Sequence, residues 1–331
     1  MHKKTKILRN LFFLLGGLAL GVLIYKTGVN NILDNIKQTG WWFAPIIGMW
    51  VIVYLANTCS IYIILNDGGQ EAKQVGFLRL FQLIVSSFAI TYITPLGMIG
   101  GEPYKVIELK RSVGIQKATS AVLLSTMMRL VSHFIFWMGS IPLLLFFVPV
   151  LSGLMEWVIT LVSLISVLFL FWAFRVYTKG GVERTIRKSV GLPFMGRRAR
   201  AFYRHNREKL HQMDDLIADL YRNRKKDFVL SLGLELFARF FMCVEVILIM
   251  QAIGSPVSFG QGVLIESIQS LVSNLFFFMP MQMGAREGGF VIVYGILSLP
   301  AAYGVFVSLC KRIRELFWTM VGLLLIRIKR D

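Results

Sequence analysis

The chain is poor in the residues that stabilise small extracellular domains and lacks the motifs typical of soluble enzymes. Its 331 residues include three cysteines, Cys59, Cys243 and Cys310, each within an apolar segment. This odd number of widely separated cysteines argues against a disulfide framework and against a zinc site built from paired cysteines. The sequence also contains no HExxH motif, no phosphate-binding P-loop and no nucleophile elbow. We therefore expect no metal, no cofactor and no enzymatic activity.

Acidic residues are scarce compared with basic ones. The chain has 18 Asp and Glu against 36 Lys and Arg, which gives a formal net charge of +18. Much of the positive charge lies between apolar runs, and residues 179–226 alone hold 14 basic and 5 acidic residues. Short basic loops of membrane proteins stay in the cytoplasm and attract anionic lipid. We therefore expect residues 179–226 to contact anionic lipids of the inner leaflet, and we expect no nucleic-acid partner.

Long apolar runs dominate the rest of the sequence, which is 56% hydrophobic with a mean hydropathy of +0.65. A helix needs roughly 20 residues to cross a bilayer, and several runs approach or exceed that length. The composition therefore predicts an all-α polytopic membrane protein that forms a single transmembrane domain over residues 1–331. The apolar runs lie near residues 8–25, 41–65, 77–96, 118–148, 152–176, 228–253, 262–281, 288–299 and 302–327.

The basic flanks of these runs predict a topology of about six spanning helices and two re-entrant hairpins. Segment 77–104 has basic flanks that place both of its ends in the cytoplasm, whereas segment 262–300 begins and ends outside. The hairpins would lie in two repeat halves, about 41–148 and about 228–327, joined through a basic cytoplasmic loop at 177–227. Both chain termini are predicted to be cytoplasmic. A plain eight-helix bundle, in which both segments cross the membrane, is the alternative.

A short motif that occurs twice supports the division into halves. The spacing from Pro to Glu is 102 − 95 = 7 in the first copy and 287 − 280 = 7 in the second. The spacing from Glu to Arg is 129 − 102 = 27 and 314 − 287 = 27. Charge repeated in apolar surroundings, beside residues that break helices, is typical of transporters with inverted repeats. The two copies consist of Pro95, Met98, Glu102 and Arg129, and of Pro280, Met283, Glu287 and Arg314.

Proline and glycine crowd around both glutamates and predict broken helices there. Irregular backbone within a membrane is tolerated only where protein or a hydrated cavity satisfies its polar groups. Glycine would permit tight turns, and the N–H groups freed where a half-helix begins would favour an anion. The predicted hairpin breaks are Pro95, Gly97, Gly100, Gly101 and Pro103 in the first copy, and Pro280, Gly284, Gly288 and Gly289 in the second.

Five charged residues are the candidate substrate-binding residues. Glu102 and Glu287 could bind a cationic group or exchange a proton, because burial raises the pKa of a carboxylate. Arg129 and Arg314 could bind a phosphate, since a guanidinium matches phosphate oxygens with paired hydrogen bonds. Arg286 could contact a headgroup from one side only, because the first copy has glycine there. Two structural interpretations stay open: each Glu only fixes its hairpin, or each Arg forms an ion pair with the Glu of its own copy.

Other charges in the apolar runs have simpler interpretations. Glu235 and Arg239 are spaced i, i+4 and are expected to form a local pair. Glu245 and Glu266 have no obvious partner in the sequence. Three further charges crowd Arg314 and are expected to form pairs or to reach the membrane interface: Lys311, Arg312 and Glu315.

Two segments resemble a known family. TPLGMIGGEPYKVIELKRSVGIQKATSAVLLSTMMRL at residues 94–130 and MPMQMGAREGGF at residues 279–290 are similar to the lysylphosphatidylglycerol synthase transmembrane family, the flippase half of the multiple peptide resistance factor. The resemblance covers nearly the whole chain. It implies translocation of a lipid across the cytoplasmic membrane, with the two Glu motifs and the arginines near the substrate path.

The sequence and the resemblance together predict a lipid translocase in the bacterial cytoplasmic (inner) membrane. Its substrate would be a phospholipid or polyprenyl-type lipid with a charged headgroup, and a homodimer is a candidate assembly. The alternatives are a secondary transporter of a small anion or polar solute, and a membrane-embedded enzyme that modifies lipids.

Overall fold

The structure is a computed structural model of the whole chain. The residues that it describes are 37–66, 75–94, 100–149, 153–179, 218–276 and 285–327, together with the single positions 30, 34 and 215. All regular secondary structure in these ranges is helical. The predicted all-α class is therefore confirmed for the described part of the chain, whereas the predicted first span at 8–25 lies outside it.

The helices coincide with the predicted apolar runs from residue 41 onward. This agreement follows because a long apolar run can be buried in lipid only as a helix, which satisfies its own backbone hydrogen bonds. One short helix, α5, comes from a segment with no apolar run. The elements are η1 (Gly40–Trp42), α3 (Phe43–Leu65), α4 (Phe77–Ile93), α5 (Gly101–Val113), α6 (Ile115–Phe147), α7 (Gly153–Lys179), α10 (Lys225–Ala252), α11 (Phe259–Leu275), α12 (Ala285–Ile296) and α13 (Ala301–Arg327).

Three of the described helical segments are long and apolar enough to cross a membrane: Lys37–Leu65, Ile115–Phe147 and Gly153–Val176. Helices α10 and α13 have 28 and 27 residues, which is long enough, but both contain several charged residues. The structure thus has the features of a multi-pass membrane protein. The number of six spans and the two re-entrant hairpins stay predictions.

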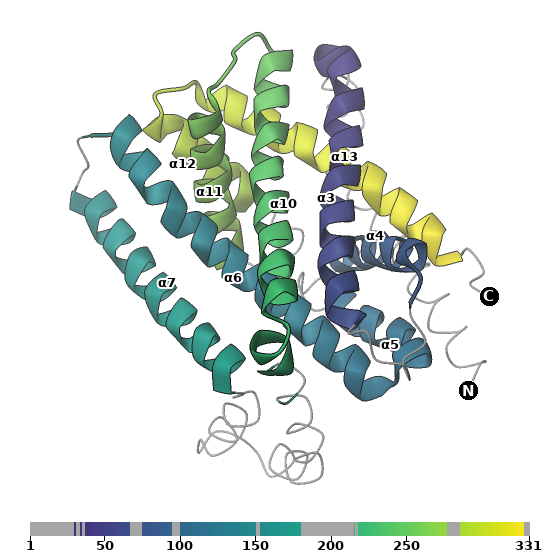
Figure 1. Cartoon of the computed structure of the whole chain (residues 1–331). Helices are drawn as coiled ribbons and strands as arrows, with labels where there is room; N and C mark the ends of the chain where they lie inside the picture. The colour runs from purple at the N-terminus through teal and green to yellow at the C-terminus, as the bar shows by residue number, and fades with distance from the viewer. Residues whose placement is uncertain are drawn as a thin grey trace, which may run out of the picture.

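Helices α3 and α10 run antiparallel through the middle of the molecule (Figure 1). Arg224, just before α10, donates to the carbonyl oxygens of Ile63 at 2.6 Å and Asn66 at 3.3 Å, so the end of α3 meets the start of α10. Further along, the hydroxyls of Ser60 and Ser231 are 2.8 Å apart. A cation at the carboxyl end of a helix satisfies its last carbonyls and its dipole, so Arg224 fixes this junction.

Helices α4 and α5 form one hairpin, and helices α11 and α12 form a second hairpin of similar size. Helix α4 has 17 residues and α5 has 13, while α11 has 17 and α12 has 12. Each hairpin packs against the long helix that follows it, α6 in the first case and α13 in the second. The longer arm of each hairpin also reaches across to the other half, so that α4 packs on α13 and α11 packs on α6. The two halves of the chain are thereby interlocked.

Glycines beside the predicted breaks serve close packing rather than turns. Gly101 begins α5, and an added Cβ there would lie 2.6 Å from the carbonyl oxygen of Ser87 on α4. Gly289 lies within α12, and its Cβ would be 3.2 Å from the Cβ of Val272 on α11. Small residues allow two helices to approach closely. The prediction that these two glycines form tight turns is therefore wrong, although both stand at the hairpins as predicted.

The remaining break residues divide into described and undescribed positions. Gly100 directly precedes α5 with an ordinary negative φ of −70°. Pro103 lies in the first turn of α5, where a missing N–H costs no helical hydrogen bond. Gly288 is an ordinary helical residue of α12. The predicted breaks at Pro95, Gly97, Pro280 and Gly284 lie outside the described residues.

Helix α7 forms one flank of the bundle and packs on α6 (Figure 1). Only 11% of its most apolar window is buried inside the protein. Its exposed side chains include Trp157, Leu161 and Phe171. An apolar helix surface of this size is expected to face lipid, because its exposure to water would be unfavourable.

Candidate functional site

The first-copy glutamate lies where three helices meet. Glu102 is the second residue of α5, and one carboxylate oxygen, Oε1, is 3.2 Å from Nη1 of Arg129 on α6. The other oxygen, Oε2, is 2.7 Å from Nζ of Lys105 and accepts a hydrogen bond from the hydroxyl of Thr126 at 3.0 Å. The Arg129 side chain is 34% exposed and the Glu102 side chain 22% exposed. One of the interpretations left open, an ion pair between the Arg and the Glu of the same copy, is thus present here, and the pair is partly accessible.

Lys105 also belongs to this site. It lies on α5, in the basic flank of segment 77–104 that was expected to be cytoplasmic. Lys105 is only 1% exposed. The i, i+3 spacing of Glu102 and Lys105 was the signal in the sequence, because side chains so spaced are neighbours on a helix.

Helix α10 adds two charges to the same site. Glu235 is buried, and its Oε2 is 4.0 Å from Nε of Arg129. Arg239 is also buried and donates from Nε to the hydroxyl of Ser132 at 2.9 Å. The predicted local ion pair between Glu235 and Arg239 is therefore not formed in the described structure. The two charges still attract each other at longer range.

The second-copy glutamate has a different partner from the one that the repeat suggests. Oε1 of Glu287, on α12, is 2.6 Å from Nη2 and 2.8 Å from Nε of Arg312 on α13. The hydroxyl of Ser308 donates to the same oxygen at 2.9 Å. Arg314 cannot take this place, because residues two apart lie on nearly opposite faces of a helix. The interpretation of Arg314 as the partner of Glu287 is wrong.

Arg314 instead turns toward α10 and α3. Its Nε and Nη2 bind the two carboxylate oxygens of Glu245 at 2.7 and 3.0 Å. The guanidinium also lies 3.6 Å from the ring centroid of Trp50, which adds a cation–π contact. Arg314 is only 2% exposed, so it does not face an opening in this conformation. Its contacts join α13 to α10 and α3.

The remaining candidate charges are paired around α13. Nη1 of Arg286 is 2.6 Å from Oε2 of Glu315. Nζ of Lys311 is 2.5 Å from Oε2 of Glu266 and 3.6 Å from Oε2 of Glu245. The expectation that the charges around Arg314 form pairs is confirmed. Glu266, which had no visible partner in the sequence, obtains one only through the packing of α11 near α13.

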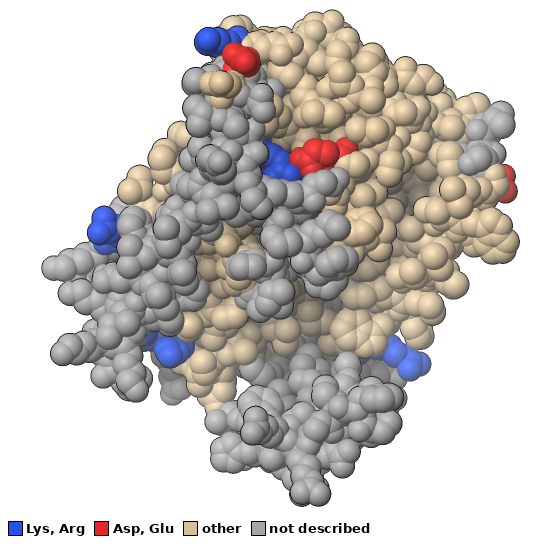
Figure 2. Space-filling model, turned by 180° about the vertical axis from the view of Figure 1, so that it is seen from behind, with Lys and Arg blue, Asp and Glu red and all other residues tan. Residues whose placement is uncertain are grey.

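Together these residues form one charged network inside an apolar bundle. Glu102 and Glu287 do not share an ion-pair partner, and they occupy separate parts of the network. Arg239 is attracted electrostatically by both Glu235 and Glu266, although it forms no ion pair with either of them. Figure 2 shows basic and acidic side chains next to each other in the upper part of a face that is otherwise largely uncharged. Charges in the interior of a membrane protein are costly to bury and are therefore typical of functional sites.

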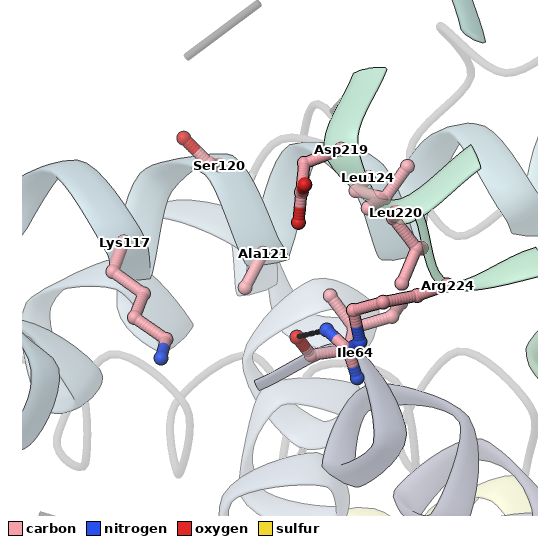
Figure 3. Close-up of a pocket in the computed structure, with 8 residues that line it drawn as sticks. All are labelled: Ile64, Lys117, Ser120, Ala121, Leu124, Asp219, Leu220 and Arg224. Carbon is pink, nitrogen blue, oxygen red and sulfur yellow. Dashed lines mark hydrogen bonds between the residues drawn. The ribbon is translucent and has the colours of Figure 1, made fainter. Parts of the chain in front are cut away.

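A small pocket lies apart from this network, between the end of α3, the start of α6 and the residues before α10. Figure 3 shows Lys117 and Arg224 directed into the same space, with Asp219 beside them. Arg224 is already engaged by the α3 carbonyls and by Asp227 at 2.7 Å. This pocket therefore belongs to the junction of the helix ends. Within the described ranges, no group of three or more His, Cys, Asp or Glu residues could hold a metal ion.

The fold and the site define a class: a helical, multi-pass membrane protein with a charged network in its interior. Comparison with known families gives the particular one. The model of the family described as "Lysylphosphatidylglycerol synthase TM region" matches residues 10–322, so the chain belongs to this family. The resemblance noted in the sequence is confirmed, and the family relates the chain to lipid handling in membranes. No curated protein and no solved structure matches the chain.

Proposed function

We propose that the protein is a translocase that moves a phospholipid or polyprenyl-type lipid with a charged headgroup across the cytoplasmic membrane. The headgroup enters the protein interior at the charged network, while the lipid tails stay in the bilayer. No covalent bond changes. The observation that carries the proposal is the partly exposed pair of Arg129 and Glu102 beside further buried charges, in a helical bundle that includes three helices long and apolar enough to cross a membrane.

The packing pattern supports an inverted repeat as the framework for this transport. The offset between the motif copies is 287 − 102 = 185 residues. Adding 185 to the bounds of α4 and α5 gives 262–278 and 286–298, close to α11 at 259–275 and α12 at 285–296. The first helix of each half, α3 or α10, contacts the other, and the two run antiparallel. Halves related in this way can exchange roles about a fixed central site, which is the basis of alternating access.

The distribution of basic residues supports an orientation. The end of α3 and the starts of α6 and α10 lie at one end of the molecule, together with the end of α7 (Figure 1). Lys117, Arg175, Lys225 and Lys226 lie in or beside these helix ends. Because basic loops stay in the cytoplasm, we infer that this end and both chain termini are cytoplasmic. Residues 179–226 would then lie against anionic lipids of the inner leaflet.

The contacts suggest how the headgroup binds. A phosphate oxygen can replace Glu102 as the partner of Arg129, because among the described residues that guanidinium has one carboxylate within 3.5 Å and it is partly exposed. Lys105 keeps the released Glu102 neutralised. On the other side, Arg312 and Glu287 offer a similar pair, and the Glu287 side chain is 31% exposed. Arg286 and Arg314 would bind a headgroup only after their pairs with Glu315 and Glu245 open.

Reconstituted vesicles test the proposal. Purified protein is placed in liposomes that contain a fluorescent phospholipid, and its transfer between leaflets is followed by quenching from outside. The wild type should accelerate transfer, and Arg129→Gln should slow it by about tenfold or more, because a hydrogen bond to a charged group contributes about 1.5–3 kcal/mol. Arg111→Gln, at an exposed cation near the end of α5, is the matched control and should transfer lipid at the wild-type rate.

Other outcomes identify the alternatives. Uptake of a labelled soluble anion with no lipid transfer would replace the proposal by a secondary transporter. A covalently changed lipid, detected by mass spectrometry of the extract, would indicate an enzyme. Equal lipid transfer by wild type and Arg129→Gln would remove Arg129 from the substrate path.

A further inference from the structure

The two motif arginines contact equivalent positions on the two central helices. Nε of Arg129, on α6, is 4.0 Å from Oε2 of Glu235 on α10. The guanidinium of Arg314, on α13, is 3.6 Å from the ring centroid of Trp50 on α3. The offset between the arginines is 314 − 129 = 185 residues, and the offset between their contacts is 235 − 50 = 185. The same offset relates the two hairpins, so each arginine meets the central helix of the opposite half at the same place.

A second pair of equivalent positions lies beside these contacts. Glu245 on α10 binds Arg314 through both carboxylate oxygens, at 2.7 and 3.0 Å. Its counterpart on α3 is Ser60, since 245 − 60 = 185, and Ser60 lies beside Glu235. Adding 185 to the bounds of α3 gives 228–250, which falls within α10. One offset thus covers the central helices as well as the hairpins, and the positions that enclose Arg314 have counterparts in the other half.

The two arginines differ in accessibility despite their equivalent positions. The Arg129 side chain is 34% exposed, and Oε1 of Glu102 lies 3.2 Å from its Nη1. Arg314 is buried, with Glu245 and Trp50 against its guanidinium. Alternating access moves one repeat against the other, so that two similar halves exchange conformations. In the conformation described here the first half presents its arginine, and the second half encloses its own.

Glu235 has hydrogen-bonding capacity that this conformation does not use. Its Oε1 is buried without a hydrogen-bond partner among the described residues, and its Oε2 lies 4.0 Å from Arg129, too far for a hydrogen bond. A buried carboxylate oxygen requires a donor, and a guanidinium can supply two in parallel. Two other cations lie near it, but Lys105 pairs with Glu102 at 2.7 Å and Arg239 donates to a serine hydroxyl. Arg129 is therefore the cation placed to complete its hydrogen bonds.

We propose that Glu235 is the second partner of Arg129 and positions it in the opposite-facing conformation of the protein. In that conformation Arg129 leaves Glu102, binds Glu235 and becomes enclosed, as Arg314 is here. At the same time Arg314 leaves Glu245 and becomes the accessible arginine. This exchange of partners is the step that changes which half is open. The inference rests on the inverted repeat of the proposed function, and it gives Glu235 a positioning role that requires no contact with the lipid.

Chemical modification of arginine tests the exchange without a transport assay. The purified full-length protein in detergent micelles is treated with phenylglyoxal, which modifies accessible guanidinium groups, and the modified peptides are quantified by mass spectrometry. In the wild type, Arg129 should react and Arg314 should be protected, in line with their different exposure. Arg111, an exposed cation of α5, is the internal reference and should react equally in every variant.

Glu245→Gln supplies the perturbation, because it weakens the site that encloses Arg314. We expect Arg314 to react faster and Arg129 to react at least about threefold more slowly, because a change that disfavours one of two conformations shifts both halves together. General loosening of the bundle would instead expose both arginines. The slower reaction of Arg129, which lies in the other half, is therefore a result that a purely structural role of Glu245 does not produce.

Removal of Glu235 tests its assigned role directly. In the double variant Glu245→Gln/Glu235→Gln, Arg129 has lost its second partner and should react as fast as in the wild type. Glu235→Gln alone should keep the wild-type modification pattern and midpoint of unfolding, because it removes an oxygen that no donor satisfies here. It should nevertheless slow lipid transfer by about tenfold or more, since the enclosed state loses a hydrogen-bonded charge pair.

An unchanged or faster reaction of Arg129 in Glu245→Gln would overturn the inference, and so would an equally slow reaction in the double variant. If Glu245→Gln does not fold, Glu245→Asp weakens the same pair by shortening the carboxylate, and the same pattern decides. These outcomes are separate from failure of the proposed function, which is the absence of lipid transfer by the wild type, because the modification pattern is measured without a lipid substrate.

Discussion

Removing the carboxylate of Glu245 should destabilise the protein strongly. Glu245 is completely buried and binds Arg314 through both of its oxygens, at 2.7 and 3.0 Å. In Glu245→Gln, the carboxylate partner that Arg314 would keep among the described residues is Glu315, 3.6 Å away. Leaving a buried charge without its partner costs about 3–5 kcal/mol. We expect the lower end of this range, about 3 kcal/mol, because Lys311 keeps its shorter pair with Glu266 at 2.5 Å.

The free energy of unfolding, measured by denaturant titration of the protein in detergent micelles, gives this cost directly. Glu156→Gln is the matched control, because Glu156 is an exposed carboxylate at the start of α7. The double variant Glu245→Gln/Arg314→Met removes both charges and keeps the volume of the Arg314 side chain. It should recover to within about 1–2 kcal/mol of the wild type, because two uncharged side chains need no compensation.

The reasoning would be refuted if Glu245→Gln were no more destabilising than Glu156→Gln. It would also be refuted if the double variant were as unstable as the sum of its single variants. Additivity of that kind would mean that Glu245 and Arg314 do not interact in the folded protein.

Two further predictions concern helix packing and helix ends. Gly322→Ala on α13 would bring a Cβ within 2.6 Å of the carbonyl oxygen of Val85 and should lower the free energy of unfolding by about 1–3 kcal/mol. Gly139→Ala is the control, because the space around Gly139 is open, and it should be neutral or stabilising. Equal effects of the two substitutions would contradict the packing of α4 on α13. Ser258→Ala removes the hydroxyl that accepts from the backbone N–H of Gln261 at 3.3 Å, and should cost about 1 kcal/mol in the same unfolding measurement, whereas no loss would show that the capping box does not stabilise α11.

Most helices could be predicted from the sequence because their signal is local. The apolar run at 118–148 corresponds to α6 at Ile115–Phe147, and the run at 302–327 corresponds to α13 at Ala301–Arg327. Helix α5 was not predicted, because its sequence is polar and contains no apolar run. A polar composition fits both a loop and a helix that covers buried charge, so the sequence alone did not show that Lys105 lies on a helix.

The candidate site was only partly predictable. The pair of Glu102 and Arg129 followed from a repeated spacing, since helices of fixed length place such residues opposite each other. The same spacing failed for Glu287, because Arg312 rather than Arg314 faces α12. A spacing identifies the helix that carries a partner, but the rotation of that helix decides which side chain makes the contact.

The sequence by itself determined the membrane class, the helical runs and the positions of the two glutamates, because hydropathy and chain length act along the chain. Only the tertiary structure decided which charges meet. Glu235 and Arg239 on α10 reach α6 in the other half, whereas Glu245 on α10 and Glu266 on α11 reach α13 within the second half. Pairing between distant segments depends on helix rotation and crossing, and neither property is encoded in a local pattern. For that reason only the structure shows that Arg239 has no carboxylate within ion-pair distance among the described residues.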